Sequence, residues 1–323
     1  MKKSDYKILF VPFYVQCPQH RFAASARIRA EWPAKYLQAD IVAPEDPGVD
    51  PSCYDLVVFQ KCYSEKFQCL ADYLKKKNPK IKLAFDLCDA EWLTREEELK
   101  AMIERMDFVI ASTNQIKKWV QRNCPGTKCY KIPDGHDLDY YSQVDYFKDG
   151  NEIKVLPIQI NEPMKYVWYG NSGTIKSLKA ILPVLERITG KGDTLTIIAD
   201  ERSQGQVQSR KIEIKLVPWT LETVNNEVRK GNLVLNPRLD TPGYAVKSNN
   251  KTVMAYILGL PCIDRLVSED QEWLADLIKF RNPEYRKEDV DKKRPELLAK
   301  YSMQAIAEMW KKHLIKNLKN DII

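Results

Sequence analysis

A short polar run in the second half of the chain concentrates groups that bind anions. Just before an apolar stretch with helical periodicity lie Lys247, Ser248, Asn250 and Lys251. One serine or asparagine is enough to cap a helix, whereas two lysines oppose the helix dipole at that end. An anionic ligand between the lysines removes this conflict. The run therefore favours a diphosphate site, with helix capping as the structural alternative.

A second anion-binding pattern lies earlier, where a predicted strand runs into a turn. Gly170 lets the backbone approach a ligand closely, and Asn171 follows it in the turn. Lys176 adds a positive charge to the first turn of the next predicted helix, whose free N–H groups also attract anions. The pattern matches neither the P-loop nor the dinucleotide-binding fingerprint. It indicates a second contact to a phosphate group.

Two aspartates and a histidine follow predicted strands in the first half of the chain. Asp86 and Asp89 come at the end of one strand, and His136 lies in a loop after the last strand. Carboxylates at such positions bind hydroxyl groups or act as a general base. Asp89 is also well placed to cap the helix that follows, which is the structural alternative.

Arginines follow the first predicted strand. In the run 21–29, Arg27 and Arg29 have the charge to hold an anionic ligand. The alternative is that they lie on the solvated start of a helix.

Strands and helices that position these residues alternate along both halves of the chain. This alternation indicates right-handed crossovers and parallel sheets. In the first half we expect strands over 7–14, 41–43, 56–59, 82–86, 108–111 and 130–132, and helices over 26–37, 67–77, 95–105 and 114–123. In the second half we expect strands over 166–169, 195–199, 212–216, 233–236 and 261–263, and helices over 177–188, 221–230, 251–258 and 296–319.

A break in this alternation divides the chain into two predicted α/β domains. Between residues 146 and 163 a turn signal and two prolines interrupt any long element. We therefore expect a Rossmann-like domain over 1–145, a linker over 146–163 and a second Rossmann-like domain over 164–295, facing a central cleft. In such sheets ligands bind at the carboxyl ends of the strands.

The two anion-binding patterns, in this order, resemble the donor-binding half of GT-B glycosyltransferases, more narrowly the retaining family 4, or glycosyl transferases group 1. In that family the second pattern ends in Ala-x-x-x-Gly-x-Pro, which Ala255, Gly259 and Pro261 match. Residues 107–112 and 132–137 resemble the family's strand before the serine turn and its Ile-Pro-Asn-Gly-Val-Asp motif. The resemblance covers most of the chain. It implies the GT-B fold and a C-terminal helix, over 296–323, that packs back on the first domain.

The chain departs from the family pattern at the paired glutamates. These fall near Val246 and Met254, and neither residue is acidic. An arginine often follows the first glycine, where this chain has Asn171. In the family the first glutamate faces the donor sugar and the second the ribose, so the sugar is left open. Asp240, in the loop before the lysine-rich run, is a candidate replacement for the sugar contact.

The resemblance implies transfer of a hexose or pentose from a nucleotide diphosphate sugar, with a UDP-sugar as first choice, to a hydroxyl group with retention of configuration. Enzymes of this fold usually need no metal, because helix dipoles and basic residues stabilise the leaving diphosphate. We therefore expect no metal and no other cofactor. The predicted donor-binding residues are Gly170, Asn171, Lys176, Asp240, Lys247, Ser248, Asn250 and Lys251. The predicted catalytic residues are Asp86, Asp89 and His136, and the predicted acceptor-binding residues are Arg27 and Arg29.

Two classes of acceptor remain open. One is a glycan or lipid-linked sugar, and the other is a hydroxymethylated pyrimidine in DNA, as in phage-type DNA modification. The formal net charge of +7 fits solvated helix faces, and the functional alternative is attraction to a polyanion such as nucleic acid or an anionic membrane surface. Two further functions also fit the fold: a non-catalytic GT-B relative that binds sugar or nucleic acid, and a nucleotide-sugar epimerase.

Composition narrows the class of protein further. Hydrophobic residues make up 44% and charged residues 29%, which is typical of a globular protein rather than a disordered one. No apolar run approaches the roughly 20 residues of a membrane helix. The apolar run near the N-terminus is too short for a signal peptide, so we expect a cytoplasmic protein, in the host cytoplasm for a viral one. The eight cysteines include no Cys-x-x-Cys pair, which argues against a structural zinc site.

Overall fold

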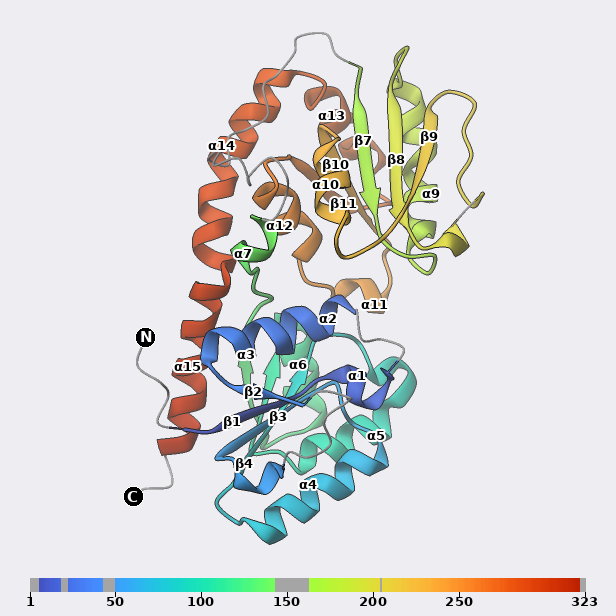
Figure 1. The fold of residues 1–323 in the computed structure, drawn as a ribbon. Coiled ribbons are helices and arrows are strands. Elements are labelled where there is room, and N and C mark those ends of the chain that lie inside the picture. Colours follow the sequence, from blue (N-terminus) through green and yellow to red (C-terminus); the bar gives the residue numbers. More distant parts are fainter. Residues whose placement is uncertain (1–5, 19–22, 43–49, 143–162, 204, 320–323) are drawn as a thin grey trace. The chain divides into compact units, whose positions relative to one another are not determined.

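The structure is a computed structural model that describes residues 6–18, 23–42, 50–142, 163–203 and 205–319 (Figure 1). The predicted linker over 146–163 lies outside these residues except for Pro163. The chain divides into two compact units. Unit 1 comprises Met1–Asp137, Ala245–Ser248 and Lys300–Ile323, and unit 2 comprises Leu138–Tyr244 and Asn249–Ala299.

The described part of unit 1 contains a six-stranded parallel sheet with the order β2–β1–β3–β4–β5–β6. Its strands are β1 (Ile8–Val11), β2 (Asp40–Ile41), β3 (Leu56–Gln60), β4 (Lys82–Leu87), β5 (Phe108–Ala111) and β6 (Lys128–Lys131). In the register of the central strands, Phe10 lies beside Val58, and Val58 beside Ala84. The direction of strand addition reverses between β1 and β3. In doubly wound sheets this reversal marks the place where ligands bind.

Helices cover both faces of this sheet. They are α1 (Phe13–Gln16), α2 (Ala24–Ala26), α3 (Trp32–Leu37), α4 (Glu65–Lys77), α5 (Trp92–Glu104), α6 (Asn114–Asn123) and α15 (Met303–Lys319). Between α2 and α3 the backbone forms a π-helical segment over Arg27–Glu31. Such segments are rare and occur often at functional sites, and this one contains both predicted acceptor-binding arginines.

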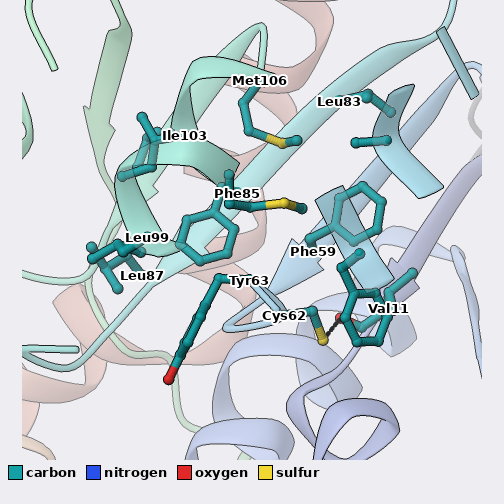
Figure 2. Packing of buried hydrophobic residues seen from close by; sticks show 14 of the residues in the cluster. Val11, Phe59, Cys62, Tyr63, Leu83, Phe85, Leu87, Leu99, Ile103 and Met106 are labelled. Atoms are coloured by element: carbon teal, nitrogen blue, oxygen red, sulfur yellow. Dashed lines mark hydrogen bonds between the residues drawn. The ribbon is translucent and has the colours of Figure 1, made fainter. Parts of the chain in front are cut away.

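The core between the sheet and α4, α5 and α6 is apolar and fully buried. Because successive strand residues point to opposite faces, Val11, Phe59 and Phe85 share this side of the sheet. Figure 2 shows Phe59 and Phe85 among these side chains, with the Cys62 thiol donating to the Val11 carbonyl oxygen at 3.6 Å. Tyr63 lies at the margin of the cluster, and its hydroxyl donates to Glu91 Oε2 at 2.8 Å. The core therefore ends at a polar group near the carboxyl edge of the sheet.

The predicted terminal helix over 296–319 is wrong in its bounds, because the structure has two helices there, α14 (Pro283–Tyr301) and α15. At the break, Ser302 forms an isolated parallel bridge with His136. The His136 N–H donates to the Tyr301 carbonyl oxygen, and the Met303 N–H donates to the His136 carbonyl oxygen, both at 2.8 Å. Backbone groups that a continuous helix would pair internally are therefore satisfied by the loop after β6.

Helix α15 packs on the other face of the unit 1 sheet. The Trp310 ring is fully buried and meets the Phe10 ring edge-on, with 5.6 Å between the centroids. Phe10 alternates with Val11 along β1, so it lies on the face opposite the α4–α6 core. The end of the chain thus completes the core of the unit in which the chain begins.

The described part of unit 2 contains a five-stranded sheet with the order β11–β10–β7–β8–β9, again entirely parallel. Its strands are β7 (Lys165–Tyr169), β8 (Thr194–Ala199), β9 (Glu213–Pro218), β10 (Leu233–Arg238) and β11 (Cys262–Leu266). Here the order reverses between β7 and β10. This is the point where a ligand is expected in unit 2.

Six further helices and α14 surround the unit 2 sheet in the described residues. They are α7 (Leu138–Tyr141), α9 (Ile175–Ile188), α10 (Val224–Arg229), α11 (Pro242–Ala245), α12 (Asn250–Ile257) and α13 (Asp270–Lys279). Helix α9 runs through Pro183, where the sequence suggests a kink or a late start, and it begins before Ser177. The core against α9 and α13 contains the fully buried Trp168 and Trp273. Two parallel α/β units confirm the predicted fold class.

Among the described residues, none of the helices combines the length and the apolar composition that crossing a bilayer requires.

Candidate functional site

Parts of both sequence patterns with anion-binding chemistry come together at the carboxyl edge of the unit 2 sheet. Strands β7 and β10 are neighbours, and their carboxyl ends meet where the strand order reverses. The turn that begins at Gly170 follows β7, and the loop that leads to α12 follows β10. The sheet thus unites two segments that are far apart in the sequence.

Lys251 makes direct contacts with the end of β7. The Tyr169 hydroxyl donates to the Lys251 carbonyl oxygen at 2.8 Å. The Lys251 ammonium lies over the rings of Trp168 and Tyr169, at 5.0 and 5.4 Å from their centroids. Cation–π contacts of this kind orient a lysine while its ammonium stays charged. A fixed positive charge therefore stands beside the Gly170 turn.

The turn after β7 has little room for larger side chains. A Cβ on Gly170 would come within 2.6 Å of Trp168 Cη2, so the turn requires glycine there. The Thr174 N–H donates to Asn171 Oδ1 at 3.1 Å, and the Asn171 N–H donates to Thr174 Oγ1 at 3.2 Å. Asn171 thus shapes the start of α9, while Lys176 in its first turn is exposed.

The start of α12 has no side-chain cap. Asn249 is the capping residue, and its side chain makes no capping hydrogen bond. Asn250, the first residue of the helix, is partly exposed. Uncapped first-turn N–H groups attract anions. Asp240, the predicted sugar contact, is exposed in the loop between β10 and α11.

Lys247 and Ser248 belong to unit 1, although the residues on both sides of Ala245–Ser248 belong to unit 2. The Ser248 hydroxyl donates to Asp134 Oδ2 at 2.6 Å, and Lys247 pairs with Asp89. The lysine-rich run is therefore divided: Asn250 and Lys251 lie with the Gly170 turn, whereas Lys247 and Ser248 lie with the predicted acceptor-side residues.

Asp89 lies between two lysines. Its carboxylate accepts from Lys61 Nζ at 2.8 Å and also pairs with Lys247, and a quarter of its side chain is exposed. Burial alone would raise the pKa of Asp89, but the charges of Lys61 and Lys247 bring it below its ordinary value. The carboxylate is thus charged at neutral pH and is a better electrostatic or hydrogen-bonding partner than a base.

Asp86 and Arg29 form a buried ion pair. Arg29 NH2 lies 2.5 Å from Asp86 Oδ2, and neither side chain is exposed by more than 1%. Arg29 NH1 also donates to the carbonyl oxygens of Ile132 and Pro133, both at 2.9 Å. Burial opposes the charge of Arg29, but Asp86 and Asp134 raise the pKa of the guanidinium. In this structure the pair holds the loop after β6 against β4.

His136 is fully buried in the same loop. Burial, together with the positive charge of Arg27, lowers its pKa to about 3, so the imidazole is neutral near pH 7. Its ring lies 6.4 Å from that of Trp32, and the Arg27 guanidinium lies over the same Trp32 ring at 5.5 Å. The backbone of His136 meanwhile anchors the break between α14 and α15.

One functional candidate, Lys61, was not found from the sequence. It follows β3 at the reversal of the unit 1 sheet, and its ammonium pairs with Asp89 and with Glu91 Oε1 at 2.6 Å. Its φ of 56° lies in the left-handed region, which a lysine seldom adopts and which often marks a functional site. The sequence signal for Lys61 is a polar residue directly after a predicted strand. Only the strand order shows that this residue lies where the unit 1 sheet reverses direction.

Outside these residues the described part of the chain offers little else for a ligand. No group of three or more His, Cys, Asp or Glu side chains there is arranged to hold a metal ion. All eight cysteines are free thiols. Two surface cavities of unit 2, of about 760 and 650 Å³, lie at the β8–β9 edge and beside α12, α13 and α14. Neither is lined by a predicted site residue.

No family model matches the chain, and no curated protein matches its sequence. Solved structures match it over nearly its whole length. Anabaena Alr3699/HepE, in complex with UDP and glucose, has a TM-score of 0.63 at 12% identity, covering 97% of this chain and 100% of that chain. An alpha-glucosyltransferase in complex with UDP and a 13-mer DNA containing an HMU base has a TM-score of 0.62 at 10% identity, covering 98% and 100%. A glycosyltransferase from Rickettsia africae has a TM-score of 0.61 at 10% identity, covering 98% and 100%. Since such identities establish the fold alone, the conclusion is that this chain has the predicted GT-B fold of two Rossmann-like domains.

Proposed function

We propose that the chain is a glycosyltransferase that moves a sugar from a UDP-sugar to an acceptor hydroxyl. The observation that carries the proposal is the meeting of Lys251, the uncapped start of α12 and the Gly170 turn where the unit 2 sheet reverses. HepE and the alpha-glucosyltransferase, which share the fold, were both determined with UDP. A nucleoside diphosphate has the charge that this edge is suited to bind.

In the proposed reaction the bond between the anomeric carbon and the diphosphate oxygen breaks, and the acceptor oxygen bonds to that carbon. Negative charge therefore develops on the departing diphosphate. Lys176, Lys251 and the first-turn N–H groups of α12 would stabilise this charge, with Gly170 allowing close approach. We propose that this stabilisation replaces a metal ion, and that the configuration of the sugar is retained.

The predicted catalytic residues Asp86, Asp89 and His136 differ in exposure, and we propose different roles for them. Asp89 retains a partly exposed carboxylate, so it is our candidate to bind the acceptor hydroxyl. Its pairing with lysines makes it a weak base, and we therefore propose that the acceptor proton passes to the leaving diphosphate oxygen. Asp86 and His136 are fully buried and would act by positioning the loop after β6.

We propose a hydroxymethylated pyrimidine in DNA as the acceptor. Two structures with this fold, both of an alpha-glucosyltransferase, contain DNA, one with an HMU base and one with an abasic site. The net charge of +7 suits such a polyanion. A glycan or lipid-linked sugar is the alternative, and an acceptor panel containing both classes distinguishes them.

The donor site is tested by alanine variants of its two lysines. We expect Lys176→Ala and Lys251→Ala each to reduce turnover of UDP-glucose by about 100-fold or more, because each removes a charge that stabilises the leaving group. Lys179→Ala is the matched control, since Lys179 is exposed on the same helix as Lys176. Near wild-type turnover in both site variants would overturn the site.

The activity itself is tested with the wild-type protein. UDP and UDP-sugars should raise the melting temperature, and free UDP should be released from one UDP-sugar. A protein that UDP stabilises, but that produces no free UDP from any UDP-sugar, would be a non-catalytic relative. NMR of the product then reports the anomeric configuration: an α-linkage from an α-linked donor means retention, and a β-linkage contradicts it.

A further inference from the structure

Helix α6 exposes a face made only of basic and amide side chains. Asn114, Gln115, Lys118, Gln121 and Arg122 are all exposed, and Lys117 is partly exposed at the margin; these six residues are the α6 face. The aliphatic residues of the helix, Ile116 and Val120, are fully buried in the unit 1 core. The helix is therefore amphipathic, and none of its fully exposed side chains is acidic or apolar, while Trp119 is partly exposed and stacks on Trp92.

No acidic residue of the same segment neutralises the charge of this face. Between Asp107 and Asp134 the chain contains no Asp or Glu. The same segment contains five cations, which are Lys117, Lys118, Arg122, Lys128 and Lys131. None of them forms an ion pair with a described residue. On α4, by contrast, Lys75 pairs with Asp107 at 2.6 Å and Lys77 with Asp50 at 2.9 Å. Uncompensated cations in one segment produce a positive surface potential.

The positive surface continues around the edge strand β6 to α15. His313 stacks on Tyr130 of β6, with 4.4 Å between the ring centroids. Burial lowers the pKa of His313, and the charges of Lys312, Lys316 and Lys117 lower it further. Lysines of α6 and α15 thus act on one group from both sides of β6.

A pair of stacked indoles lies beside the α6 face. The rings of Trp92 and Trp119 are parallel within 10°, with 4.6 Å between their centroids, and both remain partly exposed. Trp92 begins α5, three residues after Asp89, so the pair lies towards the carboxyl edge of the sheet. Aromatic surfaces next to cations provide stacking platforms for nucleobases.

We propose that the α6 face binds the phosphate backbone of a nucleic acid and leads the strand to the carboxyl edge of the unit 1 sheet. This inference rests on the proposed function, for which it identifies the class of acceptor. Amide side chains beside cations suit a nucleic acid, because they donate to and accept from phosphates and base edges. The ten residues of α6 span about 15 Å, along which one DNA strand carries roughly four phosphates.

A membrane surface fits the α6 face less well. A helix that lies on a bilayer inserts its apolar side between the lipids. The aliphatic side of α6 is already buried in the core, and the partly exposed Trp119 is stacked on Trp92 instead of projecting as an apolar anchor.

The test measures binding of a labelled mixed-sequence DNA duplex of about 20 base pairs, and of its single strands, by fluorescence anisotropy over a range of salt. The variant is Lys118→Ala with Arg122→Ala, and the control is Lys66→Ala with Lys76→Ala, which removes two exposed cations from α4. We expect the wild type to bind and the α6 variant to bind about tenfold more weakly, with a salt slope smaller by roughly two. The control variant should bind like the wild type.

Three outcomes would overturn the inference. They are no DNA binding at low salt, an equal loss in the control variant, and preferential binding to phosphatidylserine vesicles that depends on the same two cations. Release of UDP by the wild type without DNA tests the proposed function separately. UDP release without DNA binding would overturn the α6 face and the DNA acceptor but leave the transferase, and DNA binding without UDP release would overturn only the transferase.

Discussion

Individual residues of the predicted site differ mainly in burial. Asp86 and Asp89 are three positions apart, and the sequence assigns them the same chemistry. Asp86 is sealed in a pair with Arg29, whereas Asp89 stays partly exposed between Lys61 and Lys247. Breaking a buried pair by removing one charge costs several kcal/mol, so Asp86 and Arg29 bear mainly on stability. Of these two carboxylates, only that of Asp89 is exposed enough for a substrate to contact it.

His136 makes a prediction about acid sensitivity. Its pKa is lowered to about 3 in the folded chain by burial and by Arg27, while in the unfolded chain it is about 6.5. Only the unfolded chain gains this proton as the pH falls below about 6.5, so stability is present above that pH and is lost between about 6.5 and 3. At about pH 4.5 the loss from this one residue is roughly 2 to 3 kcal/mol.

The measurement compares urea unfolding of the wild type and His136→Phe from about pH 7.5 to 4.5. Carboxylates titrate in both proteins, so the difference between the two pH profiles isolates the histidine. We expect the variant to have the flatter profile. Parallel profiles would show that His136 is not a neutral buried base.

At the scale of elements, the proposed donor site depends on the turn between β7 and α9. Gly170→Ala would bring a Cβ against the buried Trp168 ring, at 2.6 Å from Cη2. We expect a loss of about 1 to 3 kcal/mol in the free energy of unfolding and weaker UDP binding, because the turn must move. Gly173→Ala is the control, since its Cβ would meet only the end of the Asn171 side chain, at 3.2 Å.

Calorimetric titration with UDP and urea unfolding of both variants test this element. A Gly170→Ala protein with wild-type stability and UDP affinity would show that the turn tolerates a side chain and does not contact the donor. Equal effects of the two substitutions would mean that the turn is sensitive throughout and that Gly170 has no special place in it.

At the scale of the whole molecule, the chain returns to its first unit at its end. Trp310 of α15 and Trp273 of α13 are both fully buried, but in different units. Alanine at either position should cost about 3 to 5 kcal/mol. We expect Trp310→Ala to increase hydrogen exchange in β1 and β3, and Trp273→Ala to increase it in β7 and β8.

Hydrogen-exchange mass spectrometry of the two variants reads out each unit by its own peptides. Each variant is the control of the other. If Trp310→Ala loosened the strands of unit 2 and left β1 and β3 protected, α15 would not be part of the first unit's core.

Local patterns in the sequence predicted much of this protein. Short apolar runs between amphipathic segments located most strands of both sheets, because a buried parallel strand is a short, continuous apolar segment. The Gly170 turn and the lysines around the start of α12 could be identified because their chemistry depends only on neighbouring residues. The helix α13 was missed, and the terminal helix was not divided at Ser302, since the partner that breaks it is His136, far away in sequence.

Only the tertiary structure decided which of these residues belong together. The order of the strands brings Lys251 to the Gly170 turn and places Lys61 beside Asp89. It also assigns Lys247 and Ser248 to the first unit, apart from the neighbours with which they form one motif in sequence. Composition and spacing report the chemistry that a segment can perform. Burial and pairing, which arise from contacts between distant segments, determine which of its charged groups remain available to a ligand.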